Sequence, residues 1–596
     1  MERVSDFIIG KLKNNGIKHI FLITGRGILY LTDAVAKEDG ITPVSTFHEQ
    51  GASYAAMAYA ASTGGMAACL VSTGCASTNA VTAALCAYQD NLPIVFISGN
   101  NPLAENTRHT GVPIRTYGSQ EADIISIVSS ITKYSVMLNN PNDVAYEVEK
   151  AVYFANEGRK GPVWIDVPLD VQNMRVDAEN LRHFYPNADA NNKQVSAKEV
   201  ETVNEELSKA QRPILLIGGG TKGCNEEVSI LAEKYHYPIV FSPAAATVYG
   251  SAHEMSIGAV GSLGGTRAGN FAVQNSDYIL AIGTKLCTQQ TGMHDKFARD
   301  AKVVVVDIDE KEHTKSGVKL DRIIISDSKV FLKALIDETP PAVSADWVDK
   351  CKHWKSFFSI SNEPFIKDLE SNNELDIYSV ANALSGVLPK DATIITDAGF
   401  EELIIPSSVD YTDGQICLFP AAQGAMGYAI PAIIGAHFAG RKNILCVVGD
   451  GSFMMNMQEL QLIKASGIPA KIMVISNNMY AVIRKRQRDL FKNRTIGNDP
   501  SDGVSQPDFR KIAGCFELKY RLISNREEFD RYIKDFSFDS SAELIEVICT
   551  PDQKYLHESY GLTEKRKLVH RPIEDMAPFL DRDIIRKEMI IDMVEE

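Results

Sequence analysis

An acid and an amide follow two neighbouring strands predicted in the C-terminal third of the chain. Asp450 stands in a Gly-Asp-Gly turn directly after an apolar run, and Asn477 follows the next apolar run. In a β-α-β unit the carboxyl ends of both parallel strands meet at one edge of the sheet, so both side chains are expected there. Carboxylate and amide oxygens are ligands for Mg²⁺ or Ca²⁺. The pattern predicts a divalent-metal site, with a purely structural turn as the alternative.

A diphosphate is the expected companion of this metal. Gly449, Gly451 and Ser452 surround the acid, and the apolar residues that follow recur at helical spacing, which predicts one helix over 453–466. The free N–H groups at the start of a helix favour phosphate oxygens. A metal beside such a helix start suits a diphosphate with Mg²⁺.

Short apolar runs alternate with helical segments nearly throughout the chain, and these elements must position the polar residues. Most runs are continuously apolar, which is typical of parallel strands buried on both faces. The predicted fold class is therefore α/β, with doubly wound, mainly parallel sheets. The expected strands lie at 19–23, 67–72, 94–99, 162–167, 214–220, 238–242, 278–283, 302–309, 393–396, 443–450, 471–477 and 544–550.

Two polar stretches divide the chain. A length of 596 residues is too great for one core and predicts about three domains. Residues around 175–200 and 338–375 are polar and irregular, so we expect linkers there. The first and third domains could share one architecture, which residue identity does not show. The predicted limits are 1–180, 190–338 and 375–560, with a C-terminal tail over 561–596.

Composition is that of a soluble globular protein. The net charge of -15 argues against a nucleic-acid partner. No apolar run approaches 18 residues and residues 1–21 lack the pattern of a signal peptide, so neither a membrane helix nor a signal peptide is expected. The ten cysteines are scattered without a CxxC pair, which is typical of free thiols. A reducing cytoplasm is the expected location.

The stretch from Gly449 to Asn478 resembles the thiamine-diphosphate motif, which begins GDG and ends NN. In that family an Asp, an Asn and a backbone carbonyl hold Mg²⁺ on the diphosphate of the cofactor. The resemblance assigns these roles to Asp450, Asn477 and the carbonyl of Met479. The usual NNxxYG occurs here as SNNMYA, so the first Asn of the pair is the expected ligand.

A second half of the site is expected near the N-terminus. A short strand precedes the segment HEQGA at 48–52, which resembles the HEqgA segment of the family. There a Glu hydrogen-bonds N1′ of the aminopyrimidine and favours the imino tautomer, whose nitrogen takes the C2 proton. The resemblance assigns this catalytic role to Glu49. Taken alone, an acid in the first turn of a helix is simply favoured by the helix dipole.

Two further segments fit the same family. Residues 72–100 resemble its tGpGatN…D..P…isG segment, and Asn79 is an expected cofactor contact. Residues 421–436 resemble the stretch that bends the cofactor into a V, where Gln423 and Met426 are expected contacts and Met426 would lie between the two rings. The structural alternative for Met426 is simple packing in a tight helix–sheet contact.

The segment LLIGGGTKG at 215–223 matches the GxGxxG pattern of nicotinamide-binding proteins. Such a protein would carry an acid at the end of the next strand, but the run at 238–245 ends in Ser and Pro. In the thiamine family this segment belongs to a central domain that binds FAD in acetolactate synthases and is empty or binds an ADP-like group in relatives. At 283–292 the glycines remain but the Arg is absent, so FAD stays open.

Two arginines are candidate substrate contacts. Residues 480–514 resemble acetolactate-synthase-like proteins encoded with sugar and surface-polysaccharide pathways, and Arg486 replaces the Trp of acetolactate synthases proper. It could line a cationic mouth for a nucleotide-linked keto-sugar, or lie on a solvated helix face. Arg26 follows Gly25, an expected cofactor contact, and could reach a substrate carboxylate.

The resemblance covers nearly the whole chain and implies an enzyme that uses thiamine diphosphate and Mg²⁺ on a 2-keto acid, with pyruvate as the expected substrate. Transfer of the resulting acyl-anion equivalent to a second carbonyl makes a carboligase, which the more extensive acetolactate-synthase-like segments favour. Protonation makes a simple decarboxylase or lyase, and a non-enzymatic relative is the third option. In the family Glu49 and Asp450 belong to different subunits, which implies a homodimer or homotetramer.

Overall fold

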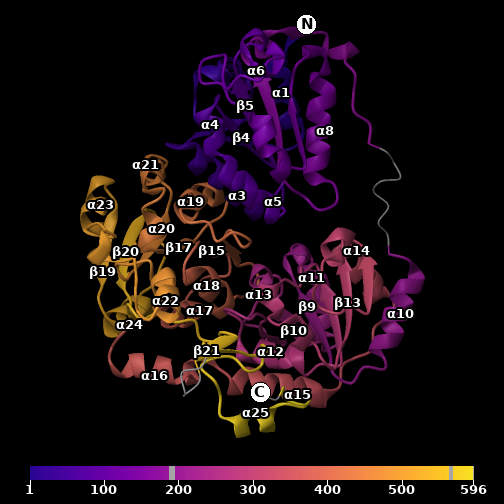
Figure 1. Ribbon diagram of the computed structural model, residues 1–596, viewed down its shortest axis with the longest axis vertical. Helices are drawn as coiled ribbons and strands as arrows, with labels where there is room; N and C mark the ends of the chain where they lie inside the picture. The colour runs from indigo at the N-terminus through magenta and orange to yellow at the C-terminus, as the bar shows by residue number, and fades with distance from the viewer. Residues whose placement is uncertain (187–194, 563–567, 595–596) are drawn as a thin grey trace.

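Three parallel sheets of six strands each form the computed structural model, which describes residues 1–186, 195–562 and 568–594. Helices pack on these sheets, and every strand pair within them is parallel (Figure 1). The predicted α/β class is confirmed. None of the helices in these ranges is long and apolar enough to cross a bilayer.

The N-terminal domain is built on the sheet order β3-β2-β4-β5-β7-β6. The inner strands β4 and β5 are buried at every residue, in agreement with their unbroken apolar sequences. Its strands are β2 (His19–Leu22), β3 (Thr42–Ser45), β4 (Ala67–Val71), β5 (Ile94–Asn100), β6 (Tyr134–Met137) and β7 (Val163–Pro168). Its main helices are α1 (Val4–Asn14), α2 (Leu29–Lys37), α3 (Glu49–Thr63), α5 (Val81–Gln89) and α8 (Val144–Asn156).

The C-terminal domain has the sheet order β16-β15-β17-β18-β20-β19. Counted along the chain, this is the order of the N-terminal sheet, 2-1-3-4-6-5, so the two domains share one architecture. The strands are β15 (Thr393–Ile395), β16 (Ile416–Leu418), β17 (Ile444–Gly449), β18 (Ala470–Ser476), β19 (Lys519–Ile523) and β20 (Glu543–Ile548). The helices around this sheet include α18 (Glu401–Ser408), α19 (Ala429–Phe438), α22 (Ala481–Leu490), α23 (Phe509–Cys515) and α24 (Arg526–Lys534).

The central domain has a different order, β11-β10-β9-β12-β13-β14, which is the 3-2-1-4-5-6 arrangement of dinucleotide-binding sheets. Its strands are β9 (Pro213–Ile217), β10 (Ile239–Phe241), β11 (Ser256–Ala259), β12 (Tyr278–Ile282), β13 (Lys302–Asp307) and β14 (Arg322–Ile325). Its helices include α10 (Ala197–Leu207), α11 (Asn225–Glu233), α12 (Arg267–Gln274) and α14 (Ser328–Asp337).

The second predicted linker is not irregular. It contains α15 (Ala345–Phe357) and α16 (Pro364–Ser371). Trp347 and Trp354 on one face of α15 are buried against the central domain, and the Trp347 indole N–H donates to the carbonyl of Pro213 at 2.9 Å. Polar residues on the other face concealed this helix in the sequence. Part of the first linker (187–194) and of the tail (563–567 and 595–596) lies outside the described residues, and the domain limits stay a prediction.

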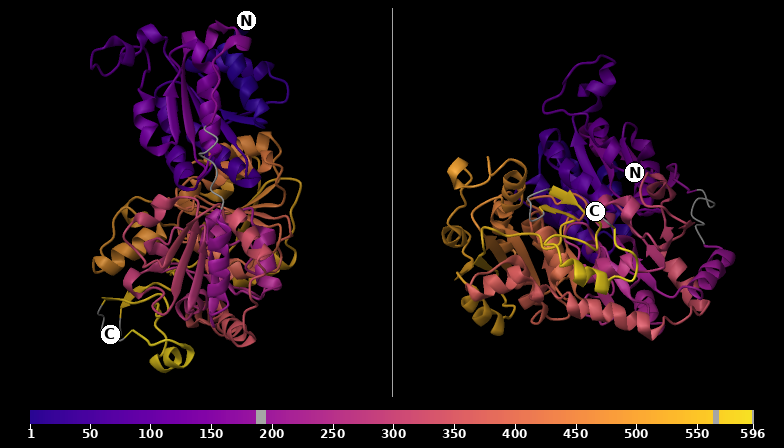
Figure 2. Two further views of the ribbon diagram at one scale, coloured as in Figure 1. Left: turned by 90° about the vertical axis from the view of Figure 1, so that its right-hand side faces the viewer. Right: turned by 60° about the horizontal axis from the view of Figure 1, so that its bottom comes forward.

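The N-terminal domain rests on the C-terminal domain through α3 and α19 (Figures 1 and 2). The two helices approach so closely that a Cβ atom on Gly435 would lie 2.0 Å from the carbonyl oxygen of Ala55. After β20 the chain, yellow in Figure 2, returns to the central domain through the hairpin β21 (Tyr560–Leu562) and β22 (Leu568–His570) and through α25 (Arg582–Glu588). The α3–α19 contact therefore joins the N- and C-terminal domains, and the returning tail joins the C-terminal and central domains.

Candidate active site

The predicted acid and amide lie together at the carboxyl edge of the C-terminal sheet. Strands β17 and β18 are parallel neighbours, with Gly449 opposite Ile475. Asp450 Oδ2 accepts the backbone N–H groups of Asn477 at 3.0 Å and Asn478 at 2.6 Å. Burial raises the pKa of Asp450 to about 6, although these two N–H groups favour its charged form. The turn therefore holds a buried carboxylate directly beside the amide of the next strand.

Asn477 has the free oxygen that a metal ligand needs. Its side-chain Oδ1 is buried and has no hydrogen-bond partner. The neighbouring Asn478 instead accepts the backbone N–H of Gln506 through Oδ1 at 3.0 Å. A buried carboxylate and a buried, unpartnered amide oxygen are hard-oxygen ligands of the kind that Mg²⁺ takes, and the backbone carbonyl of Met479 stays a prediction as the third ligand. This geometry supports Asn477, rather than Asn478, as the ligand.

The single helix predicted over 453–466 is wrong. The chain forms a short α20 (Asp450–Phe453), a 3₁₀ turn at Met457–Glu459 and α21 (Leu460–Ala465). At the break, the Asn456 amide donates to the carbonyl of Gly427 at 2.9 Å and to Gln50 Oε1 at 3.0 Å. Contacts with other parts of the chain therefore replace the continuous helix that the local apolar spacing favours.

Gly451 and Ser452, which follow Asp450, are in close contact with side chains from other segments. The Ser452 hydroxyl donates to Asp397 at 2.6 Å and accepts the N–H of Gly427 at 2.9 Å, so it is already engaged within the protein. A Cβ atom on Gly451 would lie 2.2 Å from the ring of Tyr480. Glycine is thus required at this position by the packing of an aromatic ring.

Three buried or half-buried acids beside this turn escaped the sequence analysis. Asp397, Glu401 and Glu402 follow β15, and burial raises their pKa values to about 7, 8 and 7. Glu401 Oε1 lies 3.3 Å from the position of a Cβ atom on Gly449, and Glu402 Oε2 lies 2.3 Å from that on Gly424. The signal was present, because three acids in TDAGFEE follow a predicted strand.

The predicted catalytic acid begins α3. The Asn79 amide donates to Glu49 Oε2 at 2.9 Å, which brings two of the predicted site residues together. Gly25, also predicted, lies at the neighbouring strand end, where an added Cβ atom would be 2.4 Å from Ser72 Oγ. Glu49, Asn79 and Gly25 thus all follow strands of the N-terminal sheet at its carboxyl edge.

A buried acid of the C-terminal domain bonds the N-terminal domain of the same chain. Glu459 Oε1 accepts the backbone N–H groups of Phe47 and His48, both at 3.0 Å. Burial raises the pKa of Glu459 to about 7, while the two N–H groups act in the opposite direction. The segment that carries Glu49 is therefore anchored to the segment that follows Asp450.

The loop 420–427 bonds both the N-terminal and the C-terminal domain. Gly424 and Gly427 have φ values of 53° and 81°, which only glycine adopts without strain. Met426 between them is half-buried, and the Gln423 amide donates to Gln89 Oε1 of the N-terminal domain at 2.6 Å. Both predicted cofactor contacts thus stand on a loop that touches the N-terminal domain.

The basic face of α22 is largely paired within the protein. Lys485 bonds Glu558 and Asp489, and Arg484 bonds Asp499. The exposed Arg486 lies over the ring of Tyr560, with 5.1 Å between its guanidinium carbon and the ring centroid. Arg26 is exposed on the N-terminal domain. A substrate role for either arginine stays a prediction.

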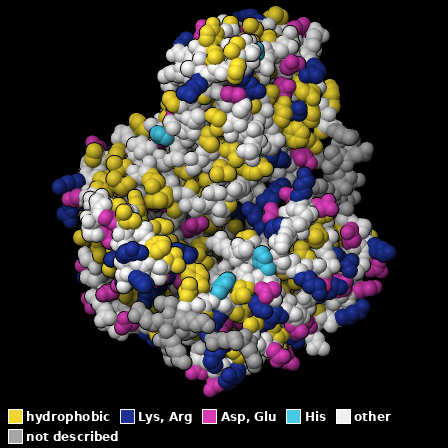
Figure 3. Space-filling view, viewed as in Figure 1, with side chains coloured by type: hydrophobic (Ala, Val, Ile, Leu, Met, Phe, Trp, Pro, Cys, Tyr) yellow, Lys and Arg dark blue, Asp and Glu magenta, His cyan; other side chains and the backbone are white. Residues whose placement is uncertain are grey.

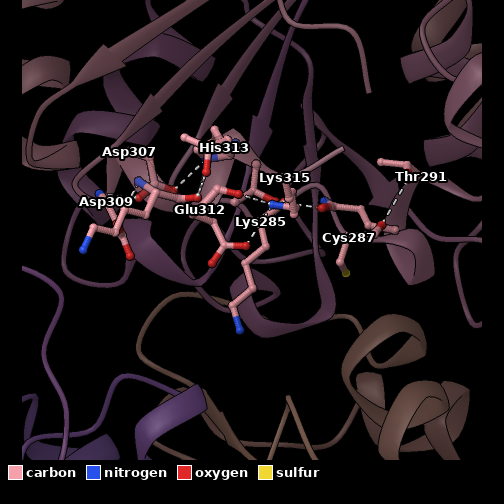
Figure 4. A network of polar contacts seen from close by, with 12 residues as sticks. Lys285, Cys287, Thr291, Asp307, Asp309, Glu312, His313 and Lys315 are labelled. Atoms are coloured by element: carbon pink, nitrogen blue, oxygen red, sulfur yellow. Dashed lines mark hydrogen bonds and ion pairs between the residues drawn. The ribbon is translucent and has the colours of Figure 1, made fainter. Parts of the chain in front are cut away.

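The first two glycines of the central GxGxxG segment, Gly218 and Gly220, serve close packing. Gly220 N–H donates to the carbonyl of Gly283 at 2.9 Å, and a Cβ atom on Gly218 would lie 2.3 Å from the same oxygen. Figure 4 shows the polar residues beyond β12 and β13 bonding to one another, with His313 3.2 Å from Asp307. FAD binding by this domain stays a prediction.

Comparison with known proteins places each domain. Three family models match in order: "Thiamine pyrophosphate enzyme, N-terminal TPP binding domain" at 2–127, the central domain at 200–335 and the C-terminal TPP binding domain at 407–547. The acetolactate synthase large subunit of Lactococcus lactis is 30% identical over 93% of both chains. That of Corynebacterium glutamicum is 31% identical over 86% of this chain and 81% of its own. Acetolactate synthase 2 of Zea mays is 29% identical over 93% and 86%.

The three matches follow one another in the family's order and together cover more than half of the chain. This chain therefore belongs to the thiamine pyrophosphate enzyme family, as an acetolactate-synthase-like enzyme that depends on thiamine diphosphate.

Proposed function

We propose that this enzyme decarboxylates pyruvate, or a closely similar 2-keto acid, and transfers the remaining two-carbon unit to a second carbonyl compound. The observation that carries the proposal is the free, buried Oδ1 of Asn477 beside Asp450, in a chain similar to acetolactate synthases over almost its full length. The simple decarboxylase or lyase remains the alternative.

Each site residue has a specific task under this proposal. Asp450, Asn477 and the carbonyl of Met479 would hold Mg²⁺ on the diphosphate. When bound, thiamine diphosphate supplies the nucleophilic carbon and the electron sink that decarboxylation requires. Glu49 would hold a proton at N1′ of the aminopyrimidine, and Asn79, which donates to Glu49 Oε2, would orient that carboxyl group.

Several finer expectations belong to the same proposal. Arg26 and Arg486 would contact the substrates, and a nucleotide-linked keto-sugar is one candidate acceptor. FAD is an option for the central domain, where it would be structural because the transfer has no net redox step. The enzyme would work in the cytoplasm as a homodimer or homotetramer.

Product analysis tests the proposal. The purified protein, with Mg²⁺ and thiamine diphosphate, is incubated with pyruvate in the presence and absence of an added aldehyde or ketone. We expect CO₂ together with a carbon–carbon coupled product. Acetaldehyde as the sole organic product would favour the decarboxylase. The small molecules released when the purified protein is denatured identify thiamine diphosphate and FAD in the same preparation.

A further inference from the structure

The turn that ends α5 consists of Gln89, Asp90 and Asn91 and lies at the boundary between the N-terminal domain and the other two domains. Asp90 caps the helix, and its N–H donates to the carbonyl of Cys86. Asn91 adopts a left-handed conformation, with φ of 60°, and Leu92 N–H returns to the carbonyl of Ala87 at 2.9 Å. These bonds fix the turn Gln89–Asn91, so its side chains have defined directions.

This turn bonds to the loop that carries Gln423 and Met426. Asp90 Oδ1 accepts the backbone N–H of Ala422 at 3.0 Å. Next to it, Gln89 Oε1 accepts the Gln423 amide at 2.6 Å. Two consecutive residues of the N-terminal domain therefore hold two consecutive residues of the C-terminal domain.

The same turn is tied to the central domain. The Gln89 carbonyl accepts Lys285 Nζ at 3.1 Å. Figure 4 shows the Lys285 side chain pointing away from the polar network of the central domain. The Asn91 amide oxygen accepts Arg159 Nε at 2.7 Å, and Arg159 in turn bonds Glu312 of the central domain at 2.7 Å. Figure 3 shows basic and acidic side chains gathered where these two domains meet.

The far end of the loop is held independently. Gly427 N–H donates to Ser452 Oγ at 2.9 Å, and the Gly427 carbonyl accepts the Asn456 amide at 2.9 Å. Ser452 and Asn456 flank the short α20 that begins at Asp450. Met426 therefore lies between two sets of hydrogen bonds, one to Ser452 and Asn456 and one to the turn Gln89–Asn91. The position of the loop depends on both sets.

We propose that Asp90 is a positioning residue, which holds the loop 420–427 through the N–H of Ala422 so that Met426 and Gln423 meet the cofactor. The inference rests on the proposed function. The inference goes beyond the proposed function because Asp90 is outside the set of residues expected to touch the cofactor. Lys285 of the central domain bonds the same turn directly, and Arg159 of the N-terminal domain links it to Glu312, so the place of the loop also depends on the central domain.

Cofactor affinity and loop exchange test this role without turnover. We expect Asp90→Ala to weaken thiamine diphosphate binding, titrated calorimetrically in saturating Mg²⁺, by about tenfold. Asp90→Asn, whose amide oxygen can still accept the Ala422 N–H, should stay within about threefold of the wild type. Amide hydrogen exchange over 420–427 should be faster in cofactor-free Asp90→Ala than in the wild type.

The matched control is Asp413→Ala. Asp413 also bonds another domain, through His253 at 2.9 Å, but not through this loop. Unchanged affinity in Asp90→Ala, or an equal loss in Asp413→Ala, would overturn the proposal. If Asp90→Ala does not fold, Gln89→Ala loosens the same loop from an exposed site, and unchanged exchange and affinity there would also overturn it. Cofactor binding without a coupled product would contradict the proposed function alone.

Discussion

The carboxylate Oδ2 of Asp450 lies 3.0 Å from the backbone nitrogen of Asn477. This bond joins the ends of two parallel strands and fixes the acid before any ligand arrives. Since the N–H of Asn478 donates to the same oxygen, Oδ2 is satisfied within the protein and the Asn477 amide oxygen faces no protein donor. The arrangement is therefore preorganised for a cation rather than for an internal hydrogen bond.

Replacement of either residue should weaken cofactor binding, and more strongly where the charged ligand is removed. We expect Asp450→Asn to weaken Mg²⁺-dependent binding of thiamine diphosphate by about 100-fold and Asn477→Ala by about tenfold. Calorimetric titration at saturating Mg²⁺ measures both. Asn478→Ala is the matched control, because its amide oxygen is already bonded to Gln506 N–H. A larger loss in Asn478→Ala than in Asn477→Ala would show that the wrong amide has been assigned.

Glu49→Gln should separate catalysis from binding. The amide keeps the shape of the side chain and can still accept from Asn79, but it cannot exchange a proton at N1′. We expect CO₂ release from pyruvate to fall by about 100-fold or more, with cofactor affinity within about threefold of the wild type. Asn79→Ala should fall by about tenfold, because the carboxyl group loses its donor. Wild-type turnover in Glu49→Gln would exclude the proposed proton transfer.

The inner strands were predictable because parallel strands buried on both faces have continuously apolar sequences. The edge strands β6, β11, β14, β16 and β19 were missed. An edge strand has one neighbour and is often partly exposed, as β19 is, so its sequence mixes apolar and polar residues. The helical second linker was missed for the same reason, since only one face of α15 is buried.

The site was predictable where chemistry follows a strand within one β-α-β unit, as for Asp450 and Asn477. Residues whose roles come from tertiary contacts were not. Glu459 lies inside a stretch predicted as one amphipathic helix, and only the folded chain brings it to the N–H groups of Phe47 and His48. Asp90 likewise meets Ala422 across more than three hundred residues, and no local spacing encodes such a pair.

Glu401 should make the cofactor-free protein less stable as the pH rises. Burial, and then the charges of Asp397 and Asp450, raise its pKa to about 8. In the unfolded chain the carboxyl group loses its proton near pH 4.3. Between these values the folded state binds more protons, so stability falls with rising pH up to about 8. The apparent Tm of Glu401→Gln should exceed that of the wild type by on the order of 2 °C at pH 8.

That difference should nearly vanish near pH 4, where the carboxyl group is protonated in the folded state and mostly protonated in the unfolded state. The control is Glu517→Gln, whose side chain is 78% exposed and whose Tm difference should not change with pH. A constant difference between pH 4 and 8 in Glu401→Gln would mean that the carboxyl group is already charged in the folded protein.

Glu363 should be essential for attachment of the C-terminal tail. Its Oε1 bonds the buried Arg267 at 2.8 Å and His557 at 3.0 Å, and Arg267 also donates to the tail carbonyl of Met576 at 3.0 Å. Glu363→Gln leaves the guanidinium without a counter-charge, which should cost about 3–5 kcal/mol. We expect a lower apparent Tm and faster proteolysis beyond residue 555. Lys352→Gln, which breaks only an exposed pair with Glu254, should change neither.

Arg486 offers a test of the acceptor side. Its cation–π contact with Tyr560 is exposed and should contribute only about 0.5–1 kcal/mol, so Arg486→Ala should fold normally. If the arginine faces the acceptor, its loss should raise the KM for an anionic acceptor by about tenfold. CO₂ release from pyruvate alone should not change. Arg488→Ala, on the same helix but paired with Asp552 at 3.0 Å, is the control and should leave both parameters near wild type. An equal loss with both variants would assign the effect to the net charge of α22 rather than to Arg486.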